Sequence, residues 1–169
     1  MSLFYPDYRF NSLMEITPED LKQMGVLGVA IDLDNTTAHD HTDTPLDGAI
    51  EWVEETRKAG FKVMILSNGK ELRAKNFAEL LGDIEYQGMS LKPLRSAYIK
   101  AQKRLNLNPK NIVMIGDQIF TDILGANLSG WKSAYVKPFA MEQRNVRSYK
   151  IRRGLEKKIF SRMDKKNNS

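Results

Sequence analysis

The sequence predicts an α/β protein, a three-layer sandwich in which helices cover both faces of a parallel central sheet. Two observations lead to this prediction. Short apolar runs without polar alternation recur along the chain, as expected for strands that are buried on both faces. Segments with helical spacing of apolar residues lie between these runs, and this alternation of strands and helices is typical of parallel sheets.

The first half of the chain contains two strand–helix units after a short leading helix. Thr17 and Pro18 predict the start of that helix, as N-cap and first helical residue, and it runs to about residue 24. Gly60 and Gly82 follow two longer helical segments, where glycine is a common C-terminal cap. We expect strands over 26–32 and 62–66 and helices over 46–59 and 70–81.

The second half continues the alternation with shorter elements. Lys92-Pro93 is expected to open a helix that runs to about residue 105, with proline in its first turn. A further helix is expected over 118–128, and Ser129-Gly130 ends it. The remaining strands are expected over 84–86, 112–115 and 133–136.

Length and composition favour one soluble globular domain. The chain has 169 residues, of which 41% are hydrophobic. No apolar stretch approaches the roughly 18 residues of a membrane-spanning helix, and the N-terminus lacks a signal-peptide pattern. The absence of cysteine excludes disulfides, thiolate metal sites and thiol nucleophiles. We therefore expect a cytoplasmic protein, with peripheral contact to the inner face of the membrane as an option.

The charge distribution is uneven and bears on partners rather than on fold. Residues 137–169 hold eleven lysines and arginines against three acids, a balance of +8, whereas the other 136 residues hold 15 against 18, a balance of −3. Ile151, Leu155, Ile159 and Met163 recur at i, i+4 spacing and predict an amphipathic basic helix within a C-terminal segment, 148–169. This helix could bind an anionic membrane, RNA or the body of the protein itself.

Polar side chains follow three of the predicted strands. Asp32, Asp34 and Thr36 come directly after the first buried strand, Ser67 follows the second, and Asp117 follows the strand at 112–115. Because ligands of open α/β sheets bind outside the carboxyl ends of the strands, these side chains would meet at one edge. The plainer interpretation is that the Asp and Ser residues form turns or helix caps for local reasons.

A cation is needed if these carboxylates meet. Hard carboxylate oxygens without nearby histidine or cysteine indicate Mg²⁺. Lys92 lies just before an expected helix N-terminus, where its ammonium and the backbone N–H groups could bind an anion, although it could also be an ordinary surface lysine. Asp122 could be favoured by the helix dipole alone. A cation, a lysine and a hydroxyl around an Asp nucleophile describe a phosphoryl-transfer site.

These residues also carry a family resemblance. Asp32-x-Asp34-x-Thr36, Ser67, Lys92 and Gly116-Asp117-x-x-x-x-Asp122 resemble, in this order, the four motifs of the haloacid dehalogenase (HAD) phosphatase superfamily. The longer phrases around them resemble its YqeG-type branch, in subfamily IIIA, which is similar to mitochondrial phosphatidylglycerophosphate phosphatases. The resemblance covers roughly residues 4–147 and implies a Rossmann-like HAD domain over 1–147. Thr37 departs from the pattern, because relatives usually place an apolar residue there.

The resemblance implies a role for each matching residue. Asp32 would attack phosphorus and form an aspartyl-phosphate, while Asp34 would act as acid and then as base. Thr36 would fix the catalytic loop, and Ser67, Asn68 and Lys92 would bind the phosphate of the substrate. The ligands of Mg²⁺ would be Asp32, the backbone carbonyl of Asp34 and Asp117, with Asp122 in support.

The gaps between the motifs bear on the substrate. Residues 37–46 and 70–91 are too short to hold a cap domain, so the site is expected to be open. An open site suits a phosphate on a large carrier, and a phospholipid such as phosphatidylglycerophosphate is the favoured substrate. Two alternatives stand: a sugar-phosphate or nucleotide phosphatase that is closed by oligomerisation, and a non-enzymatic RNA-binding module. His39 and His41 are expected to be solvated loop residues.

Overall fold

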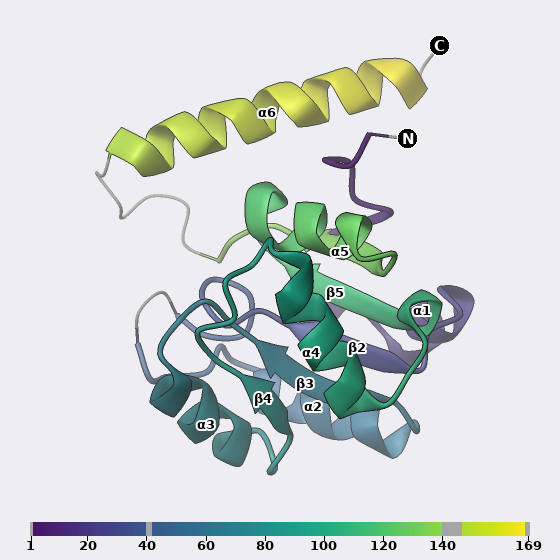
Figure 1. The fold of residues 1–169 in the computed structure, drawn as a ribbon, viewed down its shortest axis with the longest axis vertical. Coiled ribbons are helices and arrows are strands. Elements are labelled where there is room, and N and C mark those ends of the chain that lie inside the picture. The colour runs from purple at the N-terminus through teal and green to yellow at the C-terminus, as the bar shows by residue number, and fades with distance from the viewer. Residues whose placement is uncertain (1, 40–41, 140–146, 168–169) are drawn as a thin grey trace.

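One parallel sheet organises the computed structural model, which describes residues 2–39, 42–139 and 147–167 (Figure 1). Its six strands run in the spatial order β1-β6-β5-β2-β3-β4, and every neighbouring pair is parallel. The strands are β1 (Tyr8–Phe10), β2 (Gly28–Ile31), β3 (Lys62–Leu66), β4 (Glu85–Gln87), β5 (Ile112–Gly116) and β6 (Lys132–Val136). The α/β prediction is confirmed.

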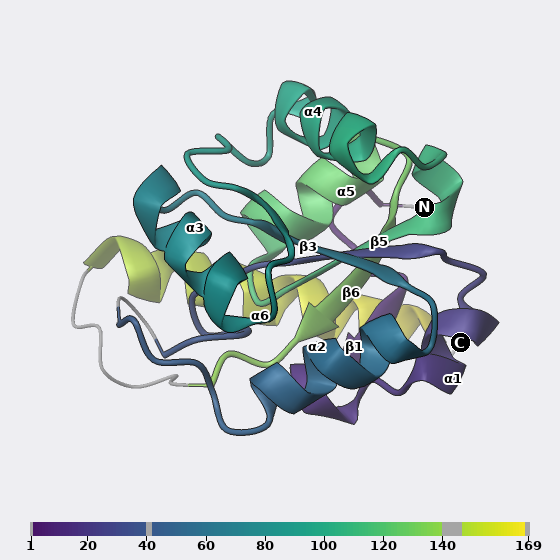
Figure 2. The same cartoon turned by 90° about the horizontal axis from the view of Figure 1, so that it is seen from below.

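Helices cover both faces of this sheet (Figure 2). Side chains of β2 alternate between two apolar cores, with Val29 and Ile31 in one and Ala30 in the other. The first core lies under α1 (Pro18–Gln23), α2 (Ala49–Lys58) and α3 (Glu71–Leu80), and the second under α4 (Arg95–Leu105) and α5 (Leu124–Leu128). Short η1 (Leu13–Glu15), η2 (Pro109–Asn111) and η3 (Ile119–Ile123) complete the body, and α6 (Arg147–Asn167) follows it.

The strand order changes direction between β2 and β5. From β2 the chain continues outward to β3 and β4, whereas β5 starts the other half of the sheet beside β2. Ile31 of β2 is level with Ile115 of β5, so the two strands end together. Such a switch point leaves a crevice at the carboxyl ends of the strands, which is where ligands of this architecture bind.

Besides shifts of a few residues at the ends of several elements, the structure differs from the expected elements in three places. Strand β1 was not predicted, because it has only three residues and lies at the sheet edge, where it pairs with β6. The helix expected from Pro93 begins at Arg95, after an extended Leu94. The helix expected over 118–128 is divided into the π-helical η3 and α5.

Helix α6 packs against the body through a face that includes Ile159 and Phe160 (Figure 1). The Phe160 ring contacts that of Tyr135 edge-on at 4.7 Å, and Arg9 pairs with Asp164 at 2.6 Å. The predicted apolar stripe is only partly buried, because Ile151 remains 61% exposed. No helix among the described residues has the length and apolar character needed to cross a membrane.

Candidate active site

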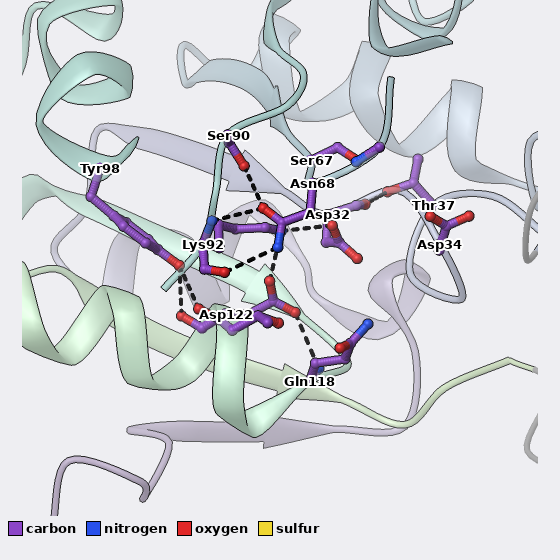
Figure 3. A network of polar contacts seen from close by, with 12 residues as sticks. Asp32, Asp34, Thr37, Ser67, Asn68, Ser90, Lys92, Tyr98, Gln118 and Asp122 are labelled. Atoms are coloured by element: carbon purple, nitrogen blue, oxygen red, sulfur yellow. Dashed lines mark hydrogen bonds and ion pairs between the residues drawn. The ribbon is translucent and has the colours of Figure 1, made fainter. Parts of the chain in front are cut away.

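Three buried aspartates meet beyond the ends of β2 and β5, and Figure 3 shows two of them, Asp32 and Asp122, beside Lys92. Asp32 follows β2, Asp117 follows β5, and Asp122 lies in η3. One carboxylate oxygen from each lies within 4.8 Å of the others. Sequence positions 85 residues apart are therefore brought to one point by the adjacent parallel strands.

Lys92 supplies positive charge to this cluster. Its Nζ lies 2.7 Å from Asp32 Oδ1 and 2.7 Å from Asp122 Oδ1, and its side chain is 2% exposed. A buried lysine between two carboxylates is held by charge-assisted hydrogen bonds rather than by solvent. Lys92 is thus no surface lysine, and it reaches the site from a loop three residues before α4 begins.

The side chain of Asn68 fixes the position of that loop. Asn68 Oδ1 accepts hydrogen bonds from the Lys92 backbone N–H at 2.7 Å and from the Ser90 hydroxyl at 2.9 Å, and Nδ2 donates to the Lys92 carbonyl at 3.0 Å (Figure 3). Ser90 and Lys92 are buried, whereas Met89 and Leu91, which alternate with them along the chain, point to solvent. Asn68 therefore positions Lys92 through its backbone.

The π-helical turn η3 places Asp122. Widened turns of this kind free backbone carbonyls and often occur at functional sites. The Tyr98 hydroxyl donates to the carbonyls of Thr121 and Asp122, at 2.9 and 3.1 Å. The second oxygen of Asp122 accepts from the Gln118 N–H at 3.1 Å. With Lys92 on the first oxygen, the Asp122 carboxylate is held on both sides.

Asp117 accepts hydrogen bonds from a side chain of the C-terminal helix α6. Arg153 of α6 lies 2.6 Å from Asp117 Oδ2 and donates to the Asp117 carbonyl at 2.9 Å. Asp117 Oδ1, in contrast, is buried and has no hydrogen-bond partner among the described residues. An unsatisfied buried carboxylate oxygen is costly, and a divalent cation would satisfy it. The cluster is therefore suited to a metal ion.

Asp34 points to the open side of the site. Its carboxylate pairs with Arg73 of α3, with N–O distances of 2.9 and 3.2 Å. Both residues line a pocket of about 700 Å³ together with Asn68, Gly69 and Leu72. The described parts of the two long connections, 32–48 and 67–94, contain no additional domain over this pocket.

The remaining predicted residues lie around this centre. Ser67 is buried, and its Oγ accepts from the Gly69 N–H at 3.0 Å. Thr36 is buried with no hydrogen bond to its hydroxyl among the described residues. Thr37 donates its hydroxyl proton to the Asp32 carbonyl at 2.7 Å, which satisfies this buried polar group. His39 is half-buried against Phe139, at 4.8 Å between ring centres, and His41 lies outside the described residues.

Burial perturbs the charged groups of the cluster. Desolvation raises the pKa of Asp32 to about 7, although Lys92 opposes the shift. Burial, with the charge of Asp32, also raises the pKa of Asp117 well above its usual range, while Arg153 opposes. Burial would lower the pKa of Lys92, but Asp122 and Asp32 outweigh it and raise the value. Without a metal, the carboxylates hold more negative charge than the site stabilises.

Fold and site together define a hydrolase. Residues 13–130 match the family model of the haloacid dehalogenase-like hydrolases, and the chain belongs to this family. It is 36% identical over 163 residues, which cover 96% of this chain and 93% of its relative, to a protein named probable phosphatase YqeG from Bacillus subtilis. The resemblance to HAD phosphatases and their YqeG-type branch is thus confirmed.

Two more distant similarities agree with this assignment. Glyceraldehyde 3-phosphate phosphatase of Pyrococcus furiosus is 27% identical over 99 residues, which cover 53% of this chain and 41% of that protein. The core domain of a candidate phosphoglycolate phosphatase from Streptococcus pneumoniae superposes with a TM-score of 0.52 at 23% identity, over 78% of this chain and 96% of that structure. This second similarity establishes the fold alone.

Sequence reasoning missed four side chains at the site. Tyr98, Arg153 and Glu156 lie in helices whose site-facing positions no motif marks, and Arg73 is one turn into α3. Arg73 lies near the start of α3, so the sequence could have placed it close to Ser67, which precedes that helix. No sequence signal predicts that α6 returns to Asp117, because that contact depends on the path of the whole C-terminal segment.

Proposed function

We propose that this protein is a Mg²⁺-dependent phosphomonoester hydrolase that works through an aspartyl-phosphate on Asp32. The observation that supports this proposal best is the meeting of Asp32, Asp117 and Asp122 around Lys92, at the switch point of the sheet. Three buried carboxylates beside one lysine suit a divalent cation and a phosphoryl group together.

The residues present fit Mg²⁺. Asp32 and the unpartnered Oδ1 of Asp117 would hold it, together with the backbone carbonyl of Asp34, and Asp122 would support them through Lys92 and Gln118. When bound, the cation neutralises charge that develops on the phosphoryl oxygens. It would also keep Asp32 ionised at neutral pH, where burial alone leaves it partly protonated.

Different side chains act in the two chemical steps, which are formation and hydrolysis of the aspartyl-phosphate. The Asp32 carboxylate attacks phosphorus as the bond to the ester oxygen breaks, and Asp34 donates a proton to that leaving oxygen. Water then attacks phosphorus, Asp34 takes a proton from it, and inorganic phosphate leaves. Lys92 and the Ser67 hydroxyl bind phosphoryl oxygens, and Thr36 holds the loop between Asp32 and the pocket. Arg73 beside Asp34 would contact the substrate at the pocket entrance.

A single substitution tests this mechanism. Asp32→Asn should reduce turnover of p-nitrophenyl phosphate by about 10³-fold or more, because the amide is not a nucleophile. Asp47→Asn, at an exposed position before α2, should leave turnover unchanged. Circular dichroism would show that both variants fold. Full activity of Asp32→Asn would exclude the covalent mechanism.

We further propose that the substrate is a phospholipid headgroup phosphate such as phosphatidylglycerophosphate, at an anionic membrane surface. The loop that carries Ser90 and Lys92 inward exposes Met89 (67%) and Leu91 (65%), and Leu72 of the pocket is 68% exposed. The Met89 backbone N–H donates to the carbonyl of Gly69, which lines the pocket, so this exposed apolar loop lies beside the phosphate site and suits an acyl or interfacial environment. The basic residues of α6 would add attraction to anionic lipid, about 1 kcal/mol for each one near the surface.

Vesicles test the lipid proposal separately from the chemistry. The double variant Met89→Ser/Leu91→Ser should hydrolyse phosphatidylglycerophosphate in phosphatidylglycerol vesicles about tenfold more slowly, a change worth about 1.4 kcal/mol. Its turnover of p-nitrophenyl phosphate should not change. Leu27→Ser is the matched control, because Leu27 is 55% exposed and precedes β2 at the opposite edge of the sheet.

The alternatives give different results in the same assays. A soluble sugar-phosphate phosphatase, as the name of the Pyrococcus furiosus relative suggests for that protein, would prefer soluble esters and ignore the vesicles. This alternative requires an oligomer that closes the open pocket, and light scattering would then show a mass above that of the monomer. A non-enzymatic RNA-binding module would bind RNA with a steep salt dependence and lose nothing with Asp32→Asn.

A further inference from the structure

Helix α6 brings a buried charged pair to the acidic cluster. Arg153 and Glu156 lie one helical turn apart, and their side chains are 13% and 3% exposed. Among the charged side chains of this helix whose burial the structure describes, these two are the ones that are not exposed. They face the body of the protein rather than solvent or a membrane.

Arg153 and Glu156 form hydrogen bonds with Asp117 and Ile119, which flank the turn between β5 and η3. Arg153 Nη2 lies 2.6 Å from Asp117 Oδ2, and Nη1 donates to the Asp117 carbonyl at 2.9 Å. Nη1 also lies 2.6 Å from Glu156 Oε2. The other Glu156 oxygen accepts from the Ile119 backbone N–H at 3.2 Å. The guanidinium therefore fixes both the backbone and the carboxylate of Asp117.

This arrangement leaves one oxygen of Asp117 for the cluster. Oδ2 is taken by Arg153, while Oδ1 is buried without a hydrogen-bond partner among the described residues. We infer that Arg153 is a positioning residue that orients Asp117 for a divalent cation, so that α6 contributes to metal binding. This inference rests on the Mg²⁺ site proposed above.

Charge balance agrees with a positioning role. Among the described residues, the ion pairs at the cluster join four carboxylates, Asp32, Asp117, Asp122 and Glu156, to Lys92 and Arg153. When all six groups are ionised, this set carries two net negative charges, which one divalent cation balances. Of the two Asp117 carboxylate oxygens, Arg153 bonds Oδ2 and leaves Oδ1, and Glu156 balances its charge. Partners of this kind, behind a metal ligand, typically contribute 10–100-fold to metal affinity.

The test is a Mg²⁺ titration of the full-length protein. Calorimetry and the Mg²⁺-induced rise of the thermal midpoint would be measured for the wild type, Arg153→Ala, Arg153→Lys and Arg162→Ala. Arg162 is the matched control, because it is an exposed arginine on the same helix. Arg153→Lys keeps the charge with less change in volume, so it serves if Arg153→Ala does not fold.

We expect Arg153→Ala to weaken Mg²⁺ binding 10–100-fold, Arg153→Lys to lie between it and the wild type, and Arg162→Ala to bind as the wild type does. Affinity of both Arg153 variants within twofold of the wild type would overturn the inference. Tighter binding would also overturn it, because Arg153 would then compete with the cation for Asp117. A wild type that binds no Mg²⁺ would instead overturn the metal site itself.

Discussion

Replacing Lys92 with methionine tests the electrostatics of the site without any substrate. The side chain keeps its length but loses the two 2.7 Å contacts to Asp32 and Asp122. All three side chains are at most 8% exposed, so water cannot replace the lost ammonium. Breaking a buried ion pair by removing one partner costs about 3–5 kcal/mol, and we expect a loss of this size in the free energy of unfolding.

The loss should depend on pH. The pKa of Asp32 in the folded protein is about 7, above its unfolded value of 3.8, so its contribution to stability is complete below that lower value and disappears as the pH rises through 7. In the variant the pKa of Asp32 is higher, because the ammonium that lowers it is gone. The contribution of Asp32 to stability therefore declines over a higher pH range than in the wild type. We therefore expect Lys92→Met to be more destabilising at pH 8 than at pH 5.

Urea unfolding without divalent ions would measure the effect at both pH values. Lys58→Met is the matched control, because Lys58 pairs with Glu54 at 2.6 Å but on a surface where solvent and salt screen the contact. It should leave the free energy of unfolding almost unchanged. If Lys92→Met were no more destabilising than Lys58→Met at pH 8, or equally so at both pH values, the electrostatic reasoning would be wrong.

Two further expectations concern the metal and the packing behind the site. Proton binding to Asp32, whose pKa is about 7, competes with Mg²⁺ binding. The Mg²⁺ affinity should therefore rise about tenfold from pH 6 to pH 8 in calorimetry. An affinity that does not change with pH would contradict this. Gly125→Ala would place its Cβ 2.3 Å from the Tyr98 ring and should cost about 1–3 kcal/mol in thermal unfolding. Gly154→Ala, with nothing within 4 Å in helix α6, should instead stabilise by about 0.5–1 kcal/mol.

Strand positions and the meeting of Asp32 with Asp117 followed from the sequence because they depend on local patterns and one topological rule. Unbroken apolar runs mark buried strands, and adjacent parallel strands bring their carboxyl ends to one edge. Lys92 was also placed at this edge, but by an incorrect local argument. The residue before proline is disfavoured in the α region, and α4 begins only at Arg95. The contacts with Asn68, distant in sequence, are what position the lysine.

The features that the sequence did not reveal depend on long-range contacts. Strand β1 has no apolar run of its own and exists through pairing with β6. The π-helical turn has no local sequence mark, and Tyr98 of α4 bonds the carbonyls there. The i, i+4 stripe of α6 left a membrane, RNA and the body of the protein as alternatives. In the structure Ile151 and Leu155 are 61% and 46% exposed, whereas Arg153 and Glu156 face the body.

The loop from Gly88 to Leu94 has one side that faces the site and another that faces solvent. Ser90 and Lys92 build the polar interior, while the alternating residues Met89 and Leu91 are exposed, with backbone φ angles of +42° and +62°. Because Leu91 directly precedes Lys92 in the chain, a displacement of the exposed side of this loop would shift the backbone that carries the ammonium. Contact of the exposed side with another surface is therefore coupled to the group that faces the nucleophile.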